Sequence, residues 1–124
     1  MSGRRAARRQ ALFLLYQWDL TGQPLTSLFE GEIDPFALTL AEEVVDQSAD
    51  LDERITAAAR DWTADRLGAV ERNVLRMAIR ELDRGELPLE IVIDEAVRLA
   101  KRYASAEGAA LVNGILGRIV REAA

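Results

Sequence analysis

Apolar residues recur along one stretch of the chain at the spacing of one face of an α-helix. The apolar positions are Val70, Val74, Leu75, Ala78, Ile79 and Leu82. Positions three and four apart share one side of a helix. Gly85 follows as the residue type that most often ends a helix in the left-handed conformation. A helix with one apolar side must bury that side against other elements, so the stretch predicts a core helix over 70–84.

Helix-start signals divide the rest of the chain into further helices. Asp34 followed by Pro35 is an N-cap residue followed by the residue type favoured in the first turn. Asp50 with Glu53 resembles a capping box, and Ser105 is a further candidate N-cap. The predicted elements are a helix over 3–20, a loop over 21–34 with a short helical turn near 25–29, and helices over 35–48, 50–62, 70–84, 91–103 and 105–119.

No segment shows the alternation of apolar and polar residues that is typical of a half-buried strand. The β-branched run at 91–93 follows Pro88 and leads directly into helical spacing, so it predicts a helix start. No linker rich in Gly, Ser or Pro interrupts the 124 residues, a length typical of one ordinary domain. The expected fold class is therefore all-α, with one domain over residues 1–124 built as a bundle of six or seven helices.

The chain contains no Cys and no His. Their absence excludes disulfides, thiolate nucleophiles, histidine-based proton transfer and the usual ligands of structural zinc. The adjacent carboxylates Glu42–Glu43 and Asp94–Glu95 are expected to be solvated, because a helical chain with 21 acidic residues contains such pairs by chance. Composition alone leaves catalysis by carboxylates open.

No apolar stretch approaches the roughly 20 residues of a membrane-spanning helix. The basic N-terminus is not followed by the apolar core of a signal peptide, because Asp19 and Glu30 interrupt the segment concerned. The chain is therefore expected to be cytoplasmic, without a membrane partner.

Four arginines crowd the first nine residues of an otherwise acidic chain: Arg4, Arg5, Arg8 and Arg9. The first ten residues carry a charge of +4 whereas the whole chain carries −5, and a concentrated guanidinium patch is what nucleic acid recognises. In a helix the four form two i,i+4 pairs, whose mutual repulsion a bound anion would relieve. The alternatives are a frayed, solvated basic tail or a segment that pairs with the acidic body of the chain, and charge alone does not decide between these and nucleic-acid binding.

Four phosphate contacts to a single strand imply a salt slope of about −2.8, too small for tight binding by the arginines alone. Tyr16 lies seven residues after Arg9 and can share its helix face, so its ring can stack on a base. A partly buried core tyrosine is the alternative. Stacking aromatics or a second protein must contribute to any tight complex.

Arginines also recur every four residues along the predicted helix over 70–84. The row is Arg72, Arg76, Arg80 and Arg84. Glu81 and Asp83 lie three residues from Arg84 and Arg80, so part of the row is expected to pair internally. A solvated helix face is favoured here over a second nucleic-acid surface.

Gly114 interrupts the last predicted helix, next to Asn113. Gly in a helix costs about 1 kcal/mol relative to Ala. The pair therefore predicts the close approach of a neighbouring backbone, with packing as the default role of Asn113 and a ligand contact as the alternative.

Four groups of residues, spread over both ends of the chain, match a known family in the family's order. They are Ala7-Arg8, Ala11-Leu12 and Leu15-Tyr16-Gln17-Trp18-Asp19-Leu20-Thr21-Gly22; Val70-Glu71-Arg72-Asn73-Val74-Leu75-Arg76-Met77-Ala78; Pro88 with Ile93-Asp94-Glu95-Ala96-Val97-Arg98-Leu99-Ala100-Lys101; and Leu111-Val112-Asn113-Gly114-Ile115-Leu116. Through them the chain resembles the bacterial transcription antitermination factor NusB family. Residues 23–60 match only in character.

The resemblance implies an all-α fold of two packed helical halves, no catalytic activity, and no cofactor or metal. It also implies a factor that binds the boxA element of single-stranded nascent RNA together with ribosomal protein NusE. In the family this complex joins the RNA polymerase elongation complex and suppresses termination, notably on ribosomal RNA operons.

The resemblance further assigns roles to individual positions. The residues implied in RNA binding are Arg4, Arg5, Arg8, Arg9, Tyr16, Glu107 and Leu111. Those implied in the NusE-facing surface are Glu71 and Arg76. The last two RNA positions belong to 106–111, which the resemblance implies is a loop before the final helix, whereas Ser105 as an N-cap places these residues in that helix. Relatives often carry a basic residue and a Phe there, where this chain has Ala110 and Leu111.

Two other interpretations stay open. One is a helical protein-interaction module, such as a homodimer, that never contacts RNA. The other is a NusB-like domain detached from a ribosomal RNA cytosine methyltransferase, although no methyltransferase domain follows in this sequence.

Overall fold

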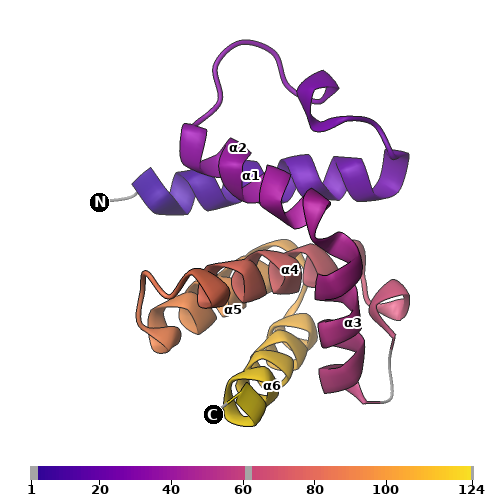
Figure 1. Cartoon of the computed structure of the whole chain (residues 1–124), viewed down its shortest axis with the longest axis vertical. Coiled ribbons are helices and arrows are strands. Elements are labelled where there is room, and N and C mark those ends of the chain that lie inside the picture. Colours follow the sequence, from indigo (N-terminus) through magenta and orange to yellow (C-terminus); the bar gives the residue numbers. More distant parts are fainter. Residues whose placement is uncertain (1–2, 61–62, 124) are drawn as a thin grey trace.

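The computed structural model describes residues 3–60 and 63–123, and every regular element within them is helical (Figure 1). The elements are α1 (Gly3–Thr21), the 3₁₀ turn η1 (Leu25–Ser27), α2 (Pro35–Asp46), α3 (Ser48–Ala59), the 3₁₀ turn η2 (Ala64–Arg66), α4 (Ala69–Arg84), α5 (Leu89–Tyr103) and α6 (Ala106–Ala123). The expected all-α class is confirmed.

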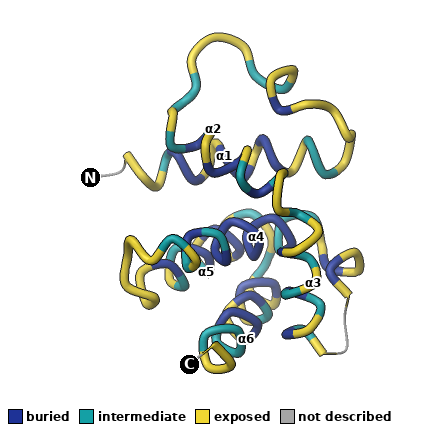
Figure 2. The backbone as a smooth tube through the Cα atoms, in the orientation of Figure 1, coloured by how far each residue is buried: buried dark blue, intermediate teal, exposed yellow. Residues whose placement is uncertain are grey.

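Helix α4 lies at the centre of the arrangement. It packs against α1 and α2 on one side and against α3, α5 and α6 on the other (Figure 1). Most of its residues are buried, and it forms the dark blue segment in the middle of Figure 2. α1 with α2 and α5 with α6 therefore form two packed halves that meet on α4, as the resemblance implies.

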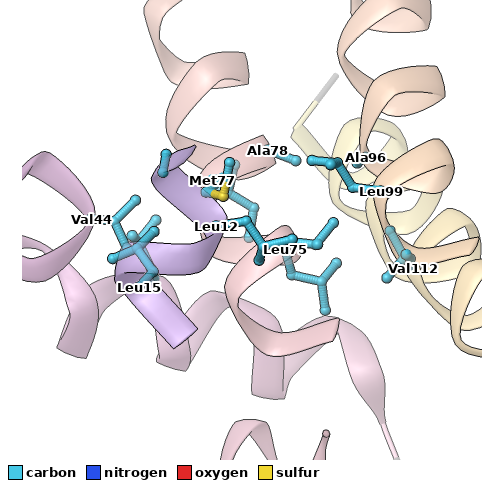
Figure 3. Packing of buried hydrophobic residues seen from close by; sticks show 14 of the residues in the cluster. Leu12, Leu15, Val44, Leu75, Met77, Ala78, Ala96, Leu99 and Val112 are labelled. Carbon is cyan, nitrogen blue, oxygen red and sulfur yellow. The ribbon is translucent and has the colours of Figure 1, made fainter. Parts of the chain in front are cut away.

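One apolar core joins the two halves. Leu12 and Leu15 of α1, Leu75 and Ile79 of α4, and Leu116 of α6 are all between 0% and 1% exposed. Figure 3 shows side chains from both halves gathered around Leu75. Burying one such side chain contributes about 1.5–3 kcal/mol, so the apolar stripe of each helix fixes which side it turns inward.

Several predicted helix ends are confirmed by their capping contacts. The Asp34 carboxylate accepts a hydrogen bond from the backbone N–H of Phe36 at 2.8 Å. Gly85 ends α4 with φ of 66°, in the left-handed region that favours glycine. The Ser105 hydroxyl accepts from the backbone N–H of Gly108 at 2.9 Å, which caps α6.

Both predicted ends of α3 and the expected loop over 106–111 are wrong. α3 begins at Ser48, so Asp50 lies inside its first turn, and the preceding Gln47 makes no side-chain capping bond. The helix then ends at Ala59, and Trp62, which was expected to close it, lies outside the described residues. The segment 106–111 is the start of α6 rather than a loop, because the Ser105 cap begins the helix at once.

The expected close approach at Gly114 is also wrong. Gly114 is exposed on α6, and a Cβ built there meets nothing within 4 Å among the described residues. The tight position on this helix is Gly108, where a Cβ would lie 2.7 Å from Oε2 of Glu71. Periodicity placed both glycines on α6 but could not show which one faces a neighbour.

Among the described residues, no helix combines the length and the apolar character that crossing a lipid bilayer requires.

Candidate nucleic-acid interface

Arg8 is the one arginine of the N-terminal cluster whose side chain is buried in the protein. Its guanidinium donates to both carboxylate oxygens of Glu81 on α4, with Nε–Oε2 at 2.9 Å and Nη2–Oε1 at 2.8 Å. The two side chains are only 6% and 9% exposed. A bidentate, buried pair of this kind uses the charge of Arg8 inside the fold and leaves little of it for a ligand.

Arg4 lies on the same side of α1 as Arg8, toward α2. Its guanidinium stacks 3.9 Å from the centroid of the Phe36 ring, in cation–π contact. Arg8 and Arg84 also lie within 6 Å of that ring, at 5.6 and 5.8 Å. These residues line a cavity of about 420 Å³ that also contains Glu81 and Glu86, so its cations and carboxylates largely balance.

Arg5 and Arg9 lie on a different side of α1, together with exposed aromatic rings. Phe13 and Tyr16 follow them at the spacing of one helix face, and their side chains are 47% and 39% exposed. Arg5 pairs with Glu95 of α5 at 3.0 Å. Arg9 is exposed and has no carboxylate partner in the part of the chain that the structure describes. This side of α1 therefore combines cations for phosphates with rings for bases.

Helix α5 runs beside this face of α1 in the same direction. The Arg5–Glu95 pair links the helices at one end, and the Phe13 and Tyr103 rings meet edge to face 5.3 Å apart at the other. The second contact lies eight residues after the first on α1 and also eight residues after it on α5. The two helices therefore run parallel. Both helices also pack on α4, and an open groove of about 930 Å³ lies between them.

Five cations line this groove, which we call the α1–α5 groove. They are Arg5 and Arg9 from α1 and Arg98, Lys101 and Arg102 from α5. Asp94 and Val97 complete the lining. Sequence reasoning missed the three cations of α5, although their spacing already placed them on one helix face. What the sequence could not provide is the neighbour, because the parallel arrangement of α1 and α5 comes from the fold.

The two RNA positions expected near α6 lie at its start. Glu107 is exposed in the first turn, whereas Leu111 is partly buried against the apolar core. Leu111 therefore offers only part of its side chain to a ligand.

The two expected partner residues of α4 differ sharply in exposure. Glu71 is partly exposed, and its carboxylate lies beside Gly68 and Gly108. Arg76 is buried: it donates to both oxygens of Asp52 at 2.7 and 2.8 Å, to Asp19 at 3.2 Å and to Asn73 at 2.9 Å. Glu71 is thus available on the surface, and the Arg76 guanidinium is occupied inside the chain.

The arginine row of α4 is not a solvated face, and this expectation is wrong. Arg72 and Arg76 are buried, and both contact the Asp19 carboxylate of α1, at 2.7 and 3.2 Å. Arg80 and Arg84 both pair with Glu43 of α2. α4 is central, so its arginines meet carboxylates on other helices before they meet water.

The expected pairing within α4 is wrong for the same reason. Glu81 bonds Arg8 of α1, and Asp83 bonds Arg54 of α3 at 2.7 Å, so neither serves its own helix. A hydrogen bond from Thr63 lowers the pKa of Asp65 in η2. Among the described residues, no group of acidic side chains is arranged to hold a metal ion.

The NusB family model matches residues 5–121, which include both walls of the α1–α5 groove. The chain belongs to the NusB family. The transcription antitermination protein NusB of Solibacter usitatus is 38% identical over 133 residues, which cover 98% of this chain and 91% of the relative. The NusB protein of Sorangium cellulosum is 40% identical over 129 residues, covering 96% and 92%.

A solved NusB-family structure shares the whole fold. It is a complex of the antitermination factors NusB and NusE with double-stranded RNA, and its matching chain superimposes with a TM-score of 0.85 at 32% identity. The match covers 98% of both chains. The arrangement of helices around α4 is therefore the NusB arrangement throughout.

Proposed function

We propose that this NusB-family chain is an RNA-binding transcription antitermination factor without catalytic activity. It binds boxA-type single-stranded RNA together with ribosomal protein NusE, and the complex suppresses termination by RNA polymerase, notably on ribosomal RNA operons. Its place of action is the cytoplasm, where bacterial transcripts are made. The relatives named as antitermination proteins and the NusB–NusE–RNA complex of a relative support this assignment.

The observation that carries the RNA role is the exposed face of α1. Arg5 and Arg9 precede Phe13 and Tyr16 on one side of the helix. Proteins that bind single-stranded nucleic acid usually combine cations along the phosphate backbone with aromatic rings on which the bases stack. The net charge of the whole chain is −5, so this face is a local exception to a surface that repels RNA.

A partner protein completes the proposed site. Single-stranded RNA contributes about 0.7 to the salt slope for each phosphate contact, and Arg8 is already paired with Glu81. The remaining N-terminal arginines give too weak a grip for a specific complex. We assign the NusE-facing surface to the region of Glu71, a partly exposed residue of α4 whose carboxylate lies beside Gly108 of α6.

The test is a titration of the chain, with and without NusE, against a boxA-like single-stranded RNA, a scrambled single strand and a duplex. We expect NusE to tighten binding to the boxA-like strand at least tenfold, and the scrambled strand to bind more weakly. Binding to RNA that is indifferent to both NusE and sequence would contradict the proposed function. Light scattering on the free chain measures its molar mass. A dimer mass together with no RNA binding would favour the alternative of a homodimeric protein-interaction module.

A further inference from the structure

We propose that α5 supplies the second wall of the RNA site: Arg98, Lys101 and Arg102 bind the phosphates of one RNA strand lying along the α1–α5 groove. This inference rests on the proposed function and assigns a part of the site that lies outside the N-terminal arginines. Its substrate class is an unpaired polyribonucleotide.

Charge is the first argument. The groove gathers five cations against two carboxylates, Asp94 in its lining and Glu95 bonded to Arg5, in a chain whose net charge is −5. The cavity on the other side of α1, beside Phe36, has its arginines matched by Glu81 and Glu86, with Glu43 bound to Arg84. An incoming polyanion therefore finds more uncompensated positive charge between α1 and α5 than beside Phe36.

Availability is the second argument. Arg98 is 59% exposed and lies 4.0 Å from Glu95, a long contact that leaves its donors free. Lys101 and Arg102 are exposed as well, and Arg102 donates to the hydroxyl of Tyr103 at 3.1 Å. The arginines of α4, by contrast, are committed to carboxylates on other helices. The α5 cations are the ones that a phosphate reaches without breaking the fold.

The aromatic end of the groove favours a single strand. Phe13 meets Tyr103 edge to face, and the Arg102 guanidinium lies 5.4 Å from the centroid of the Tyr103 ring. Exposed rings and guanidinium planes stack on splayed bases, which a duplex keeps paired. The distance along the helices from the Arg5–Glu95 pair to the Phe13–Tyr103 pair is about 12 Å, at 1.5 Å per residue. Phosphates and bases thus have separate, adjacent places along one wall.

Glu95 links the two walls of the groove in the free protein. Its carboxylate bonds Arg5 and lies near Arg98, so it bridges the two walls. A phosphate entering the groove competes for the same guanidinium groups. The Arg5 side chain is half exposed, so a phosphate can reach its guanidinium, whereas the Glu95 side chain is 15% exposed.

The number of cations sets the expected salt dependence. Five phosphate contacts to a single strand imply a slope of about −3.5, and Arg5 with Arg9 alone imply about −1.4. Removing Arg98 and Arg102 should lower the magnitude of the slope by about 1.4 and weaken binding roughly 10- to 30-fold near 0.1 M salt.

The experiment compares Arg98→Ala/Arg102→Ala with Arg66→Ala/Arg121→Ala, a control that removes the same charge from exposed residues outside the groove. Both are titrated against a boxA-like single strand and its duplex at several salt concentrations, with and without NusE. We expect the stated losses for the α5 variant, wild-type behaviour for the control, and weaker binding of the duplex.

The outcomes separate this inference from the function on which it rests. If the unaltered chain binds no RNA even with NusE, the proposed function falls and the inference falls with it. If the unaltered chain binds RNA and the α5 variant keeps its affinity and slope, only the inference is overturned. Equal losses in the control variant, or equal binding of the duplex, overturn it as well.

Discussion

Arg8 of α1 and Glu81 of α4 form a bidentate ion pair across 73 positions of sequence, with both side chains buried. The pair distinguishes Arg8 from the other N-terminal arginines. Arg8 secures α1 to the central helix, whereas Arg5 and Arg9 face the α1–α5 groove. Four arginines that look equivalent in sequence therefore have different tasks.

Arg8→Ala should destabilise the fold strongly. It leaves the Glu81 carboxylate buried without its partner, and breaking a buried pair in this way costs about 3–5 kcal/mol. Urea denaturation followed by circular dichroism measures the loss in free energy of unfolding. Arg9→Ala is the matched control and should stay within about 0.5 kcal/mol of the unaltered chain, because its side chain is exposed. Equal stability of the two variants would show that the pair contributes nothing.

Arg9→Ala should act on RNA binding instead. Losing one phosphate contact lowers the magnitude of the salt slope by about 0.7 and the affinity several-fold near 0.1 M salt. Fluorescence titration of a labelled single strand at three salt concentrations gives both quantities. A slope that does not change would remove Arg9 from the phosphate contacts.

Glu95→Gln should tighten RNA binding. The substitution removes the carboxylate that competes with phosphate for Arg5, and the amide keeps the size of the side chain. We expect a gain of several-fold at low salt that shrinks as salt rises, since screening weakens the competing pair. The stability cost should stay below about 1 kcal/mol because the Arg5 side chain is half exposed and the glutamine amide can still accept its hydrogen bond. Weaker binding by this variant would mean that Glu95 positions Arg5 for RNA rather than competing with it.

Asp19→Asn should lower stability by about 3 kcal/mol. Its carboxylate accepts from Arg72, Arg76 and Asn73, and the neutral amide leaves the two buried guanidinium groups short of negative charge. Thermal unfolding by calorimetry measures the effect. Glu32→Gln, at an exposed loop position, serves as the control for removing one acidic charge.

Gly114→Ala should stabilise the chain by about 0.5–1 kcal/mol. Gly114 lies inside α6, and a Cβ there meets nothing in the described structure. Gly85→Ala should destabilise by about 1 kcal/mol, because φ at Gly85 is 66°. Paired urea curves test both signs at once. A Gly114→Ala variant that is stable but loses NusE or RNA binding would identify this spot as a contact.

The helices could be predicted from sequence because their signals are local. The apolar stripe over Val70–Leu82, the Asp34 cap and the Gly85 terminus each depend on residues within a few positions of one another. The start of α3 was predicted wrongly for the same reason. Asp50 is a residue type that can cap a helix, but α3 begins two residues earlier, at Ser48. Local signals fix the kind of element more reliably than its first residue.

The candidate site could be predicted only in part because it depends on distant neighbours. The sequence showed that Arg5 and Arg9 can share a face with Tyr16, but not that α5 lies opposite them. It offered Glu81 as a partner for Arg84, whereas the fold brings Glu81 to Arg8. The residues that share a helix face can be predicted from the sequence. The element that packs against that face depends on how the helices pack around α4.

The ion pairs at the two ends of α1 have opposite polarity. Near its start, α1 gives the cation and α4 the carboxylate (Arg8 and Glu81); near its end, α1 gives the carboxylate and α4 the cations (Asp19 with Arg72 and Arg76). A slide of α1 along α4 by one turn would break both pairs, and a reversed helix would set like charges together. The RNA-facing side of α1 is therefore held in one position in the free protein, so a strand meets a preorganised row and spends little of its binding free energy on ordering it.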